Sequence, residues 1–139
     1  IGWDLQALTG GRFVLGLGTQ IAPHITQRFS MPWSEPVARL REMVAAIRAI
    51  WRSWETGERL SFAGRYYTRT RMIPAFDPGP SPFGAPRILT AGFGPQMTAL
   101  AGECAKVTVA QLAVLRWQLS QLPVIVAWVV LFGLPTALR

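Results

Sequence analysis

The sequence predicts an α/β fold in which strands alternate with helices and pair in parallel. Two short apolar segments, residues 12–18 and 87–91, are bounded by glycine or proline, as buried parallel strands usually are. A segment with the apolar spacing of an α-helix follows each of them. Because strands that alternate with helices form βα units, we expect both strands to belong to one parallel sheet.

The chain opens with a short helical segment and the first strand. Residues 4–8 are typical of the last turns of a helix, and the Thr-Gly-Gly sequence at 9–11 is a turn signal that ends it. The strand at 12–18 follows this turn. Residues 19–33 contain two prolines among mixed polar residues, so we expect a loop there.

The clearest predicted element is a long helix that starts after residue 34. Its apolar side chains recur at helical spacing and form one face, which consists of Val37, Leu40, Met43, Val44, Ile47, Ile50, Trp51 and Trp54. We expect Ser34 as the N-cap and Pro36 in the first turn. We expect Gly57 to end the helix in the left-handed backbone conformation. The tryptophans and methionines of this face are expected to pack in the core.

A hairpin and a proline-rich loop separate this helix from the second strand. Residues 60–67 predict a hairpin that turns at Ala63-Gly64, and residues 74–86 hold five prolines and two glycines. Because proline fixes φ, we expect this loop to be extended. A tight turn at 92–95 and a helix over 96–105 follow the second strand. One face of that helix is apolar and consists of Met97, Leu100, Ala101 and Cys104.

The amino-acid composition excludes several classes of protein and several kinds of site. The 139 residues are 50% hydrophobic and 15% charged, which is enough apolar material for a folded core. The single cysteine, Cys104, excludes an internal disulfide and a cysteine-based zinc site, and with one histidine, His24, no metal is expected. The net charge is +7, but no basic run exceeds two residues, so we expect no nucleic-acid partner.

Residues 106–139 differ from the rest of the chain. No acidic residue follows Glu103, and residues 117–138 carry no charge. The run 122–138 is only marginally long enough for a membrane span and contains two prolines, so a membrane-attached module is the least favoured interpretation, beside a buried helix or strand pair. The chain begins without methionine or a signal-like segment, and we expect a truncated start and a cytoplasmic location.

The end of the first strand, residues 16–20, is one candidate ligand site. In parallel α/β folds, ligands bind at the carboxyl ends of the strands. A glycine at Gly18 lets a planar ligand approach the backbone closely, and Thr19 and Gln20 offer hydrogen bonds to the edge of a ring.

The turn after the second strand is the other candidate ligand site. Gly94 precedes a helix, so the N–H groups of Gln96, Met97 and Thr98 are expected to be free and to form an anion site suited to phosphate. Plain tight turns are the alternative interpretation of both motifs. Neither the further glycine of a dinucleotide fingerprint nor a Walker-type lysine is present.

A longer pattern around these motifs resembles the luciferase-like oxidoreductase family. The family's LSxGRFxLGLG segment is similar to Leu5-Gln6 with residues 9–20. The similar pattern continues in His24-Ile25, Arg28-Phe29, residues 31–34, residues 39–42, residues 62–67 and residues 94–103. It covers about residues 1–105 and is most similar to the branch that uses the deazaflavin coenzyme F420.

The resemblance implies a (β/α)₈ barrel, of which about two strands are visible here. The fold expected is therefore α/β, a partial TIM barrel that is incomplete at both ends. Residues 1–105 would form this partial barrel domain, with a hairpin and proline-rich insertion at about 58–86. The implied activity is hydride transfer between F420, or alternatively FMN, and a small-molecule organic substrate.

The resemblance also implies roles for individual residues. Those expected to bind the cofactor are Gly18, Thr19 and Gln20 near its ring and Gly92, Phe93, Gly94, Gln96 and Met97 near its phosphate. His24 would lie in the loop above the barrel mouth and act as a substrate-side acid or base, since imidazole titrates near neutrality. A structural hydrogen bond from a loop histidine is the alternative.

The resemblance ends after Glu103. The family continues there with a small residue and Ala-Asp-Gly, whereas this chain has Cys-Ala-Lys-Val at 104–107. We therefore expect a partial oxidoreductase, followed at 106–139 by an apolar tail that is out of frame. The alternative is a non-catalytic gene remnant without a functional cofactor site, whose exposed sheet edges favour self-association as a homo-oligomer.

A shifted reading frame makes a direct prediction about the coding DNA. One of the other two frames past Glu103 is expected to encode a sequence like Ala-Asp-Gly. If neither frame does so, residues 106–139 are a genuine continuation of the chain, and the frame hypothesis is wrong.

Overall fold

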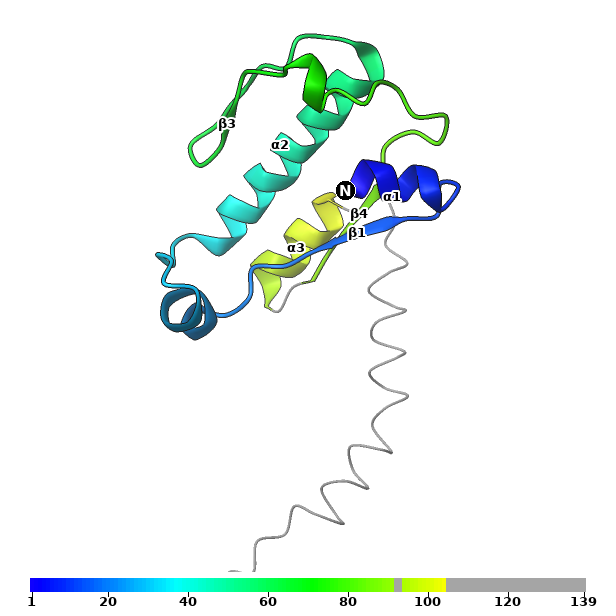
Figure 1. Ribbon diagram of the computed structural model, residues 1–139. Coiled ribbons are helices and arrows are strands. Elements are labelled where there is room, and N and C mark those ends of the chain that lie inside the picture. The colour runs from blue at the N-terminus through cyan, green and yellow to red at the C-terminus, as the bar shows by residue number, and fades with distance from the viewer. Residues whose placement is uncertain (92–93, 105–139) are drawn as a thin grey trace, which may run out of the picture. The chain divides into compact units, whose positions relative to one another are not determined.

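The computed structural model describes residues 1–91 and 94–104, which form an α/β unit (Figure 1). Its elements are α1 (Gly2–Leu8), β1 (Val14–Leu17), the π-helix η1 (His24–Arg28), α2 (Pro36–Thr56), β2 (Phe62–Ala63), β3 (Thr68–Arg69), the 3₁₀-helix η2 (Pro74–Phe76), β4 (Arg87–Thr90) and α3 (Pro95–Cys104). The order of the α-helices and strands is the order that the sequence predicts, whereas η1 and η2 lie in segments where the sequence predicts loops. The hairpin turns at residues 64–67 and not at Ala63-Gly64, because Ala63 pairs with Thr68. The predictions for the tail at 106–139, its membrane segment included, lie outside the described residues.

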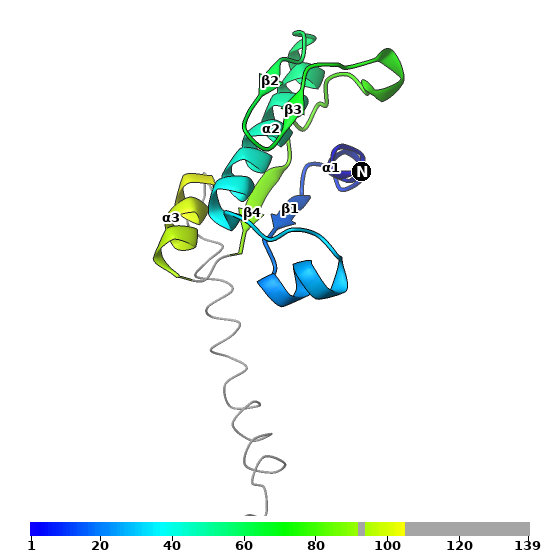
Figure 2. The ribbon, with the colours of Figure 1, turned by 90° about the vertical axis from the view of Figure 1, so that its left-hand side faces the viewer.

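The two longer strands pair in parallel, as predicted. The register runs from Val14 opposite Arg87 to Leu17 opposite Thr90, and the N–H of Ala91 extends it by donating to the Leu17 carbonyl over 3.0 Å. Helix α2 and the small antiparallel hairpin of β2 and β3 lie in the crossover between the two strands. Figures 1 and 2 show β1 and β4 side by side with α3 near β4. The described residues therefore contain one βα crossover and no closed barrel.

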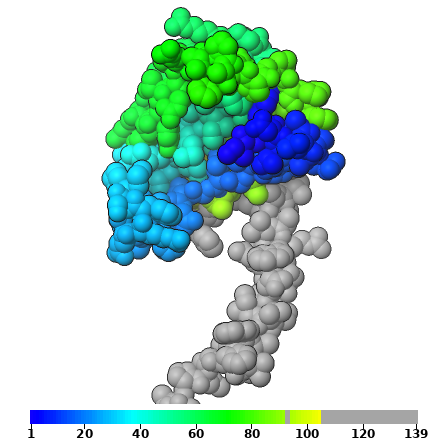
Figure 3. All heavy atoms as spheres, in the orientation of Figure 1, coloured from blue at the N-terminus to red at the C-terminus, as the bar shows by residue number. Residues whose placement is uncertain are grey.

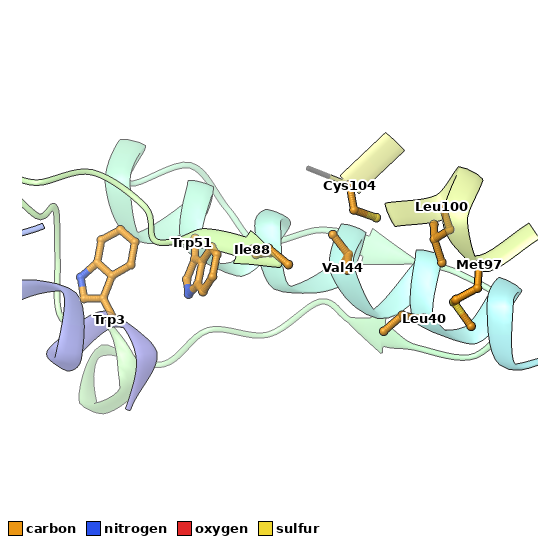
Figure 4. Close-up of a cluster of buried hydrophobic side chains, with 8 residues drawn as sticks. All are labelled: Trp3, Leu40, Val44, Trp51, Ile88, Met97, Leu100 and Cys104. Carbon is orange, nitrogen blue, oxygen red and sulfur yellow. The ribbon is translucent and has the colours of Figure 1, made fainter. Parts of the chain in front are cut away.

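The core lies where α2 and α3 meet the sheet. Its buried side chains come from α1, α2, β4 and α3 (Figure 4), and they are Trp3, Leu40, Val44, Trp51, Ile88, Met97, Leu100 and Cys104. Leu15 and Leu17 of β1 pack against this cluster from the strand. The apolar spacing thus predicts the buried face of α3 and the core residues of α2, whereas the buried Ala46 and Ser53 of α2 lie outside the predicted face and Ile50 is half-buried.

Tryptophans join α1 to the C-terminal half of α2. The ring centroid of Trp3 lies 6.5 Å from that of Trp51 and 5.4 Å from that of Trp54, in the tilted and edge-on arrangements that aromatic pairs prefer. The tryptophans of α2 are therefore packing residues, as expected from the sequence. They fix α1, and with it the turn that leads into β1.

The two ends of α2 differ in how well the sequence predicts them. Gly57 ends the helix in the left-handed conformation with φ of 71°, as predicted. Ser34 as the N-cap is wrong, because Glu35 occupies that position with φ of 42° and makes no side-chain cap. The Ser34 hydroxyl instead accepts a hydrogen bond of 3.0 Å from Arg39 Nε. Glu35 thus lies in the left-handed region and not in the extended region that a residue before proline usually adopts.

An ion pair connects α2 with α3. Arg41 donates to both carboxylate oxygens of Glu103, from Nε over 2.9 Å and from Nη2 over 3.2 Å. The Arg41 guanidinium holds the pKa of the Glu103 carboxyl below its ordinary value, chiefly through this hydrogen bond. Because the folded-state pKa is the lower one, this contribution is present at neutral pH and is lost as the pH falls through that value.

Cys104 is buried at the end of α3. Desolvation by burial raises the pKa of its thiol, so this cysteine is expected to stay protonated at neutral pH.

None of the helices within residues 1–91 and 94–104 combines the length and apolar composition that a membrane crossing requires.

Leu100 tests this core most simply, because its side chain is 0% exposed. We expect Leu100→Ala to lower the free energy of unfolding by about 2–5 kcal/mol, through lost burial and the cavity it leaves. Urea unfolding followed by tryptophan fluorescence measures this loss. Leu8→Ala is the control, since Leu8 is 81% exposed and its truncation should change stability by less than about 0.5 kcal/mol. Equal effects of the two changes would contradict the described core.

Candidate functional site

The parallel pairing of β1 and β4 brings their carboxyl ends to the same edge of the sheet. A cleft of about 620 Å³ lies there, which we call the strand-end cleft. It is lined by Gly18, Thr19, Gln20, Ile21, Pro36, Val37, Ala91, Gly94, Pro95, Gln96 and Met97. Six of the eight residues predicted to bind a cofactor are among them, and the other two, Gly92 and Phe93, lie outside the described residues.

The β1 side of the strand-end cleft has an open backbone and one strained residue. A Cβ added at Gly18 would meet no atom nearer than Ala91 Cβ at 4.0 Å, so a flat molecule has access to the main chain here. The Thr19 hydroxyl donates to the Gln20 carbonyl over 3.1 Å. Gln20 has φ of 61°, a conformation that costs a side-chain residue about 1–3 kcal/mol and that recurs at functional sites.

The β4 side of the strand-end cleft is the beginning of α3. The helix starts at Pro95, and Gly94 before it has φ of 83°. The N–H of Thr98 donates to the Gly94 carbonyl over 3.0 Å, so the prediction that this group is free is wrong. Thr98 is the first residue far enough into the helix to find an intrahelical acceptor, which leaves Gln96 and Met97 as the first-turn donors.

His24 does not line the strand-end cleft, but it contacts a residue that does. It is exposed in the π-helix η1, and its Nδ1 lies 3.2 Å from Gln20 Oε1. The sequence predicts a loop over 19–33, whereas the structure has the π-helix η1 within it. The Phe29 N–H closes this turn by donating to the His24 carbonyl over 3.2 Å. A π-turn of this kind leaves no periodic signal, because it spans a single turn.

A second cavity, of about 580 Å³, shares a wall with the first, and we call it the loop pocket. Gly18, Thr19 and Pro36 line both cavities. The other residues that line the loop pocket are Ile25, Phe29, Met31, Pro32, Trp33, Ser34, Arg39, Leu40, Met43 and Tyr67. The sequence does not predict this pocket. Its only signal there is that Ile25, Phe29, Met31 and Trp33 are large apolar residues scattered among polar ones in the expected loop.

A larger cavity of about 940 Å³ lies at the other end of α2. It is bordered by residues 53–60 and by parts of the proline-rich segment 70–80. None of the predicted site residues lines it. We therefore place the candidate site at the strand ends, where the motifs meet, although this other cavity is larger.

Glu42 of α2 fixes the hairpin that closes one side of the loop pocket. Its Oε1 accepts hydrogen bonds of 2.7 Å from the N–H groups of both Tyr66 and Tyr67, and its Oε2 accepts one of 3.0 Å from that of Arg65. A Cβ at Gly64 would overlap this carboxylate, so the turn requires glycine there. Three charge-assisted bonds to backbone donors thus hold Tyr67 at the pocket wall.

Comparison with known sequences identifies relatives. The sequence profile of the luciferase-like monooxygenase family matches residues 2–121, past residue 105 where the motif resemblance ends. The uncharacterized protein Rv1360 of Mycobacterium tuberculosis is 53% identical over 105 residues, which are 76% of this chain and 31% of that protein. Phthiodiolone/phenolphthiodiolone dimycocerosates ketoreductases of Mycobacterium tuberculosis and Mycobacterium kansasii are 35% identical over 101 residues, or 73% of this chain.

These comparisons also set the extent of the similarity. The chain spans 31% of the length of the first of these relatives and 25–26% of the length of the ketoreductases. No solved structure matches the chain significantly.

The role of Glu42 can be tested with Glu42→Gln. An amide cannot accept from all three backbone N–H groups, so we expect the free energy of unfolding to fall by about 1–3 kcal/mol. Amide hydrogen exchange should speed up at residues 65–67 while the centre of α2 keeps its protection. Glu55→Gln on the same helix is the control, since Glu55 is exposed and its carboxylate makes no hydrogen bond within the described residues. Unchanged exchange at 65–67 would show that Glu42 does not hold the hairpin.

Proposed function

The chain belongs to the luciferase-like monooxygenase family, and from this premise we propose that it is an oxidoreductase. We propose that it transfers hydride between coenzyme F420, or alternatively FMN, and a small organic substrate. The observation that carries the proposal is the strand-end cleft. It gathers two motifs from distant parts of the sequence at the one edge where α/β folds bind their ligands.

We propose that β1 and β4 are neighbouring strands of a family barrel. Their parallel pairing, the crossover through α2 and the core that α2 and α3 form on one side of them support this. In a barrel, helices cover the outer face and the active site lies at the carboxyl ends of the strands. Val14 and Gly16, which alternate with the packed Leu15 and Leu17, would then face the barrel interior.

The residues of the strand-end cleft fit a phosphorylated, flavin-like cofactor. A cleft of about 620 Å³ lies within the range of about 300–1,000 Å³ that small-molecule sites occupy. Gly18 would allow the ring to approach the backbone, and the first-turn N–H groups of Gln96 and Met97 would bind the phosphate at the positive end of the α3 dipole. When bound, the cofactor supplies the hydride chemistry, and these residues orient it.

His24 is proposed to act through Gln20 and not as a direct acid or base. Its contact with Gln20 Oε1, and its place outside the lining of the strand-end cleft, support a positioning role. The neutral imidazole with a proton on Nδ1 would donate to this oxygen and hold the Gln20 amide in one orientation at the cleft wall.

The ketoreductase relatives suggest the kind of reaction. Their names state that they reduce a keto group, and they share 35% identity with this chain. We propose the same reaction class here, in which a carbonyl carbon accepts the hydride and its oxygen takes up a proton. The reverse reaction would oxidise the corresponding alcohol.

Titration of the purified chain with F420 and with FMN tests the proposal. We expect binding to change the fluorescence of one cofactor, with F420 preferred. Gly18→Leu should weaken binding by more than about tenfold, because the added side chain fills the strand-end cleft. Gly102→Leu is the matched control, since a side chain at this exposed position of α3 meets nothing within 4 Å.

Two results would count against this function. Absence of a spectral change with either cofactor would favour the alternative, a chain without a functional cofactor site. Equal binding by the Gly18 and Gly102 variants would show that the cofactor binds elsewhere.

A further inference from the structure

We infer that the loop pocket binds the body of a neutral, apolar substrate, with the reacting group at the wall formed by Gly18 and Thr19. This inference rests on the proposed function, because the reaction requires a cofactor in the strand-end cleft. The two cavities share Gly18, Thr19 and Pro36, so a molecule in the loop pocket lies directly beside one in the strand-end cleft.

The chemistry of the wall specifies an apolar ligand. Large apolar side chains line it from the segment before α2 and from α2 itself, and among them are Phe29, Met31, Trp33 and Met43. Phe29 is 54% and Met31 59% exposed. Exposed apolar side chains that gather around a cavity are a mark of binding surfaces, whereas scattered ones are ordinary. The segment that carries them, residues 20–35, lies at one corner of the space-filling view (Figure 3).

Arg39 is the single charged residue of the loop pocket, and the wall already holds its guanidinium. Its Nε donates to the carbonyl and the hydroxyl of Ser34 over 3.1 and 3.0 Å, and its Cζ lies 4.6 Å from the centre of the Tyr66 ring. An arginine that is bonded and stacked in this way presents its flat face and its methylene stem as packing surface. We therefore expect no requirement for an anionic group on the ligand.

Backbone strain is concentrated in the same segment. The residues other than glycine with positive φ in the described chain are Gln20, Ser30 and Glu35, at 61°, 52° and 42°. They lie within residues 20–35, which supply six of the thirteen residues that line the loop pocket, and the π-helix η1 lies between Gln20 and Ser30. Unfavourable backbone conformations and π-turns persist where a binding surface needs them, so their grouping here supports a ligand role for the wall.

The inference is tested with Prodan, a neutral naphthyl ketone whose emission shifts to the blue in apolar surroundings. We expect the full chain to bind Prodan without any cofactor. Phe29→Ser and Met31→Ser should each weaken binding by about tenfold, because each removes apolar contact from the wall. Phe76→Ser is the matched control, since Phe76 is 70% exposed on η2 and does not line the loop pocket. Far-ultraviolet circular dichroism checks that the variants fold.

The outcomes separate this inference from the proposed function. Prodan binding that depends on Phe29 and Met31 supports the loop pocket, even where neither F420 nor FMN binds and the proposed function fails. No Prodan binding by the unmodified chain, or equal loss in the Phe76 variant, overturns the inference. Cofactor binding in the separate titration would then leave the proposed function standing.

Discussion

The parallel pairing of β1 with β4 is the constraint on which the rest of the structure depends. It places the carboxyl ends of two strands, which are distant in sequence, at one edge, where Gly18 and Gln96 line the same cleft. The same pairing presents Leu17 and Ile88 to the helices, so the core and the candidate site depend on one register. A slip of one residue would turn the buried face of one of the two strands outward and offset the two motifs along the sheet edge.

The crossover between these strands shapes the second cavity. Helix α2 packs its apolar face on the sheet, and its polar face is left to hold the hairpin through Glu42. The segment between β1 and α2 folds over the first turns of the helix, with strained backbone at Gln20 and Glu35. The proposed cofactor site and the proposed apolar pocket therefore share one wall, and the hairpin of the 58–86 insertion closes another side of the pocket through Tyr67.

The elements that depend on local periodicity are predicted well from the sequence. The core residues of α2 and the left-handed end at Gly57 follow from spacing and residue type alone. Two of the wrong predictions concern hydrogen-bond partners that the sequence does not specify. The Ser34 hydroxyl accepts from Arg39 instead of capping the helix, and the Thr98 N–H donates within α3. The hairpin wall of the loop pocket could not be predicted from the sequence. Glu42 holds it through backbone N–H groups, which nearly every residue type provides and which therefore leave no sequence signal.

The hydrogen bond from the Ala91 N–H to the Leu17 carbonyl gives the most direct test of this parallel pairing. Nuclear magnetic resonance detects the scalar coupling that such a bond transmits between the amide nitrogen and the carbonyl carbon. We expect a measurable coupling between these two residues, with slow exchange of the Ala91 amide proton. No coupling, together with rapid exchange of that proton, would contradict the shared strand edge and the site built on it.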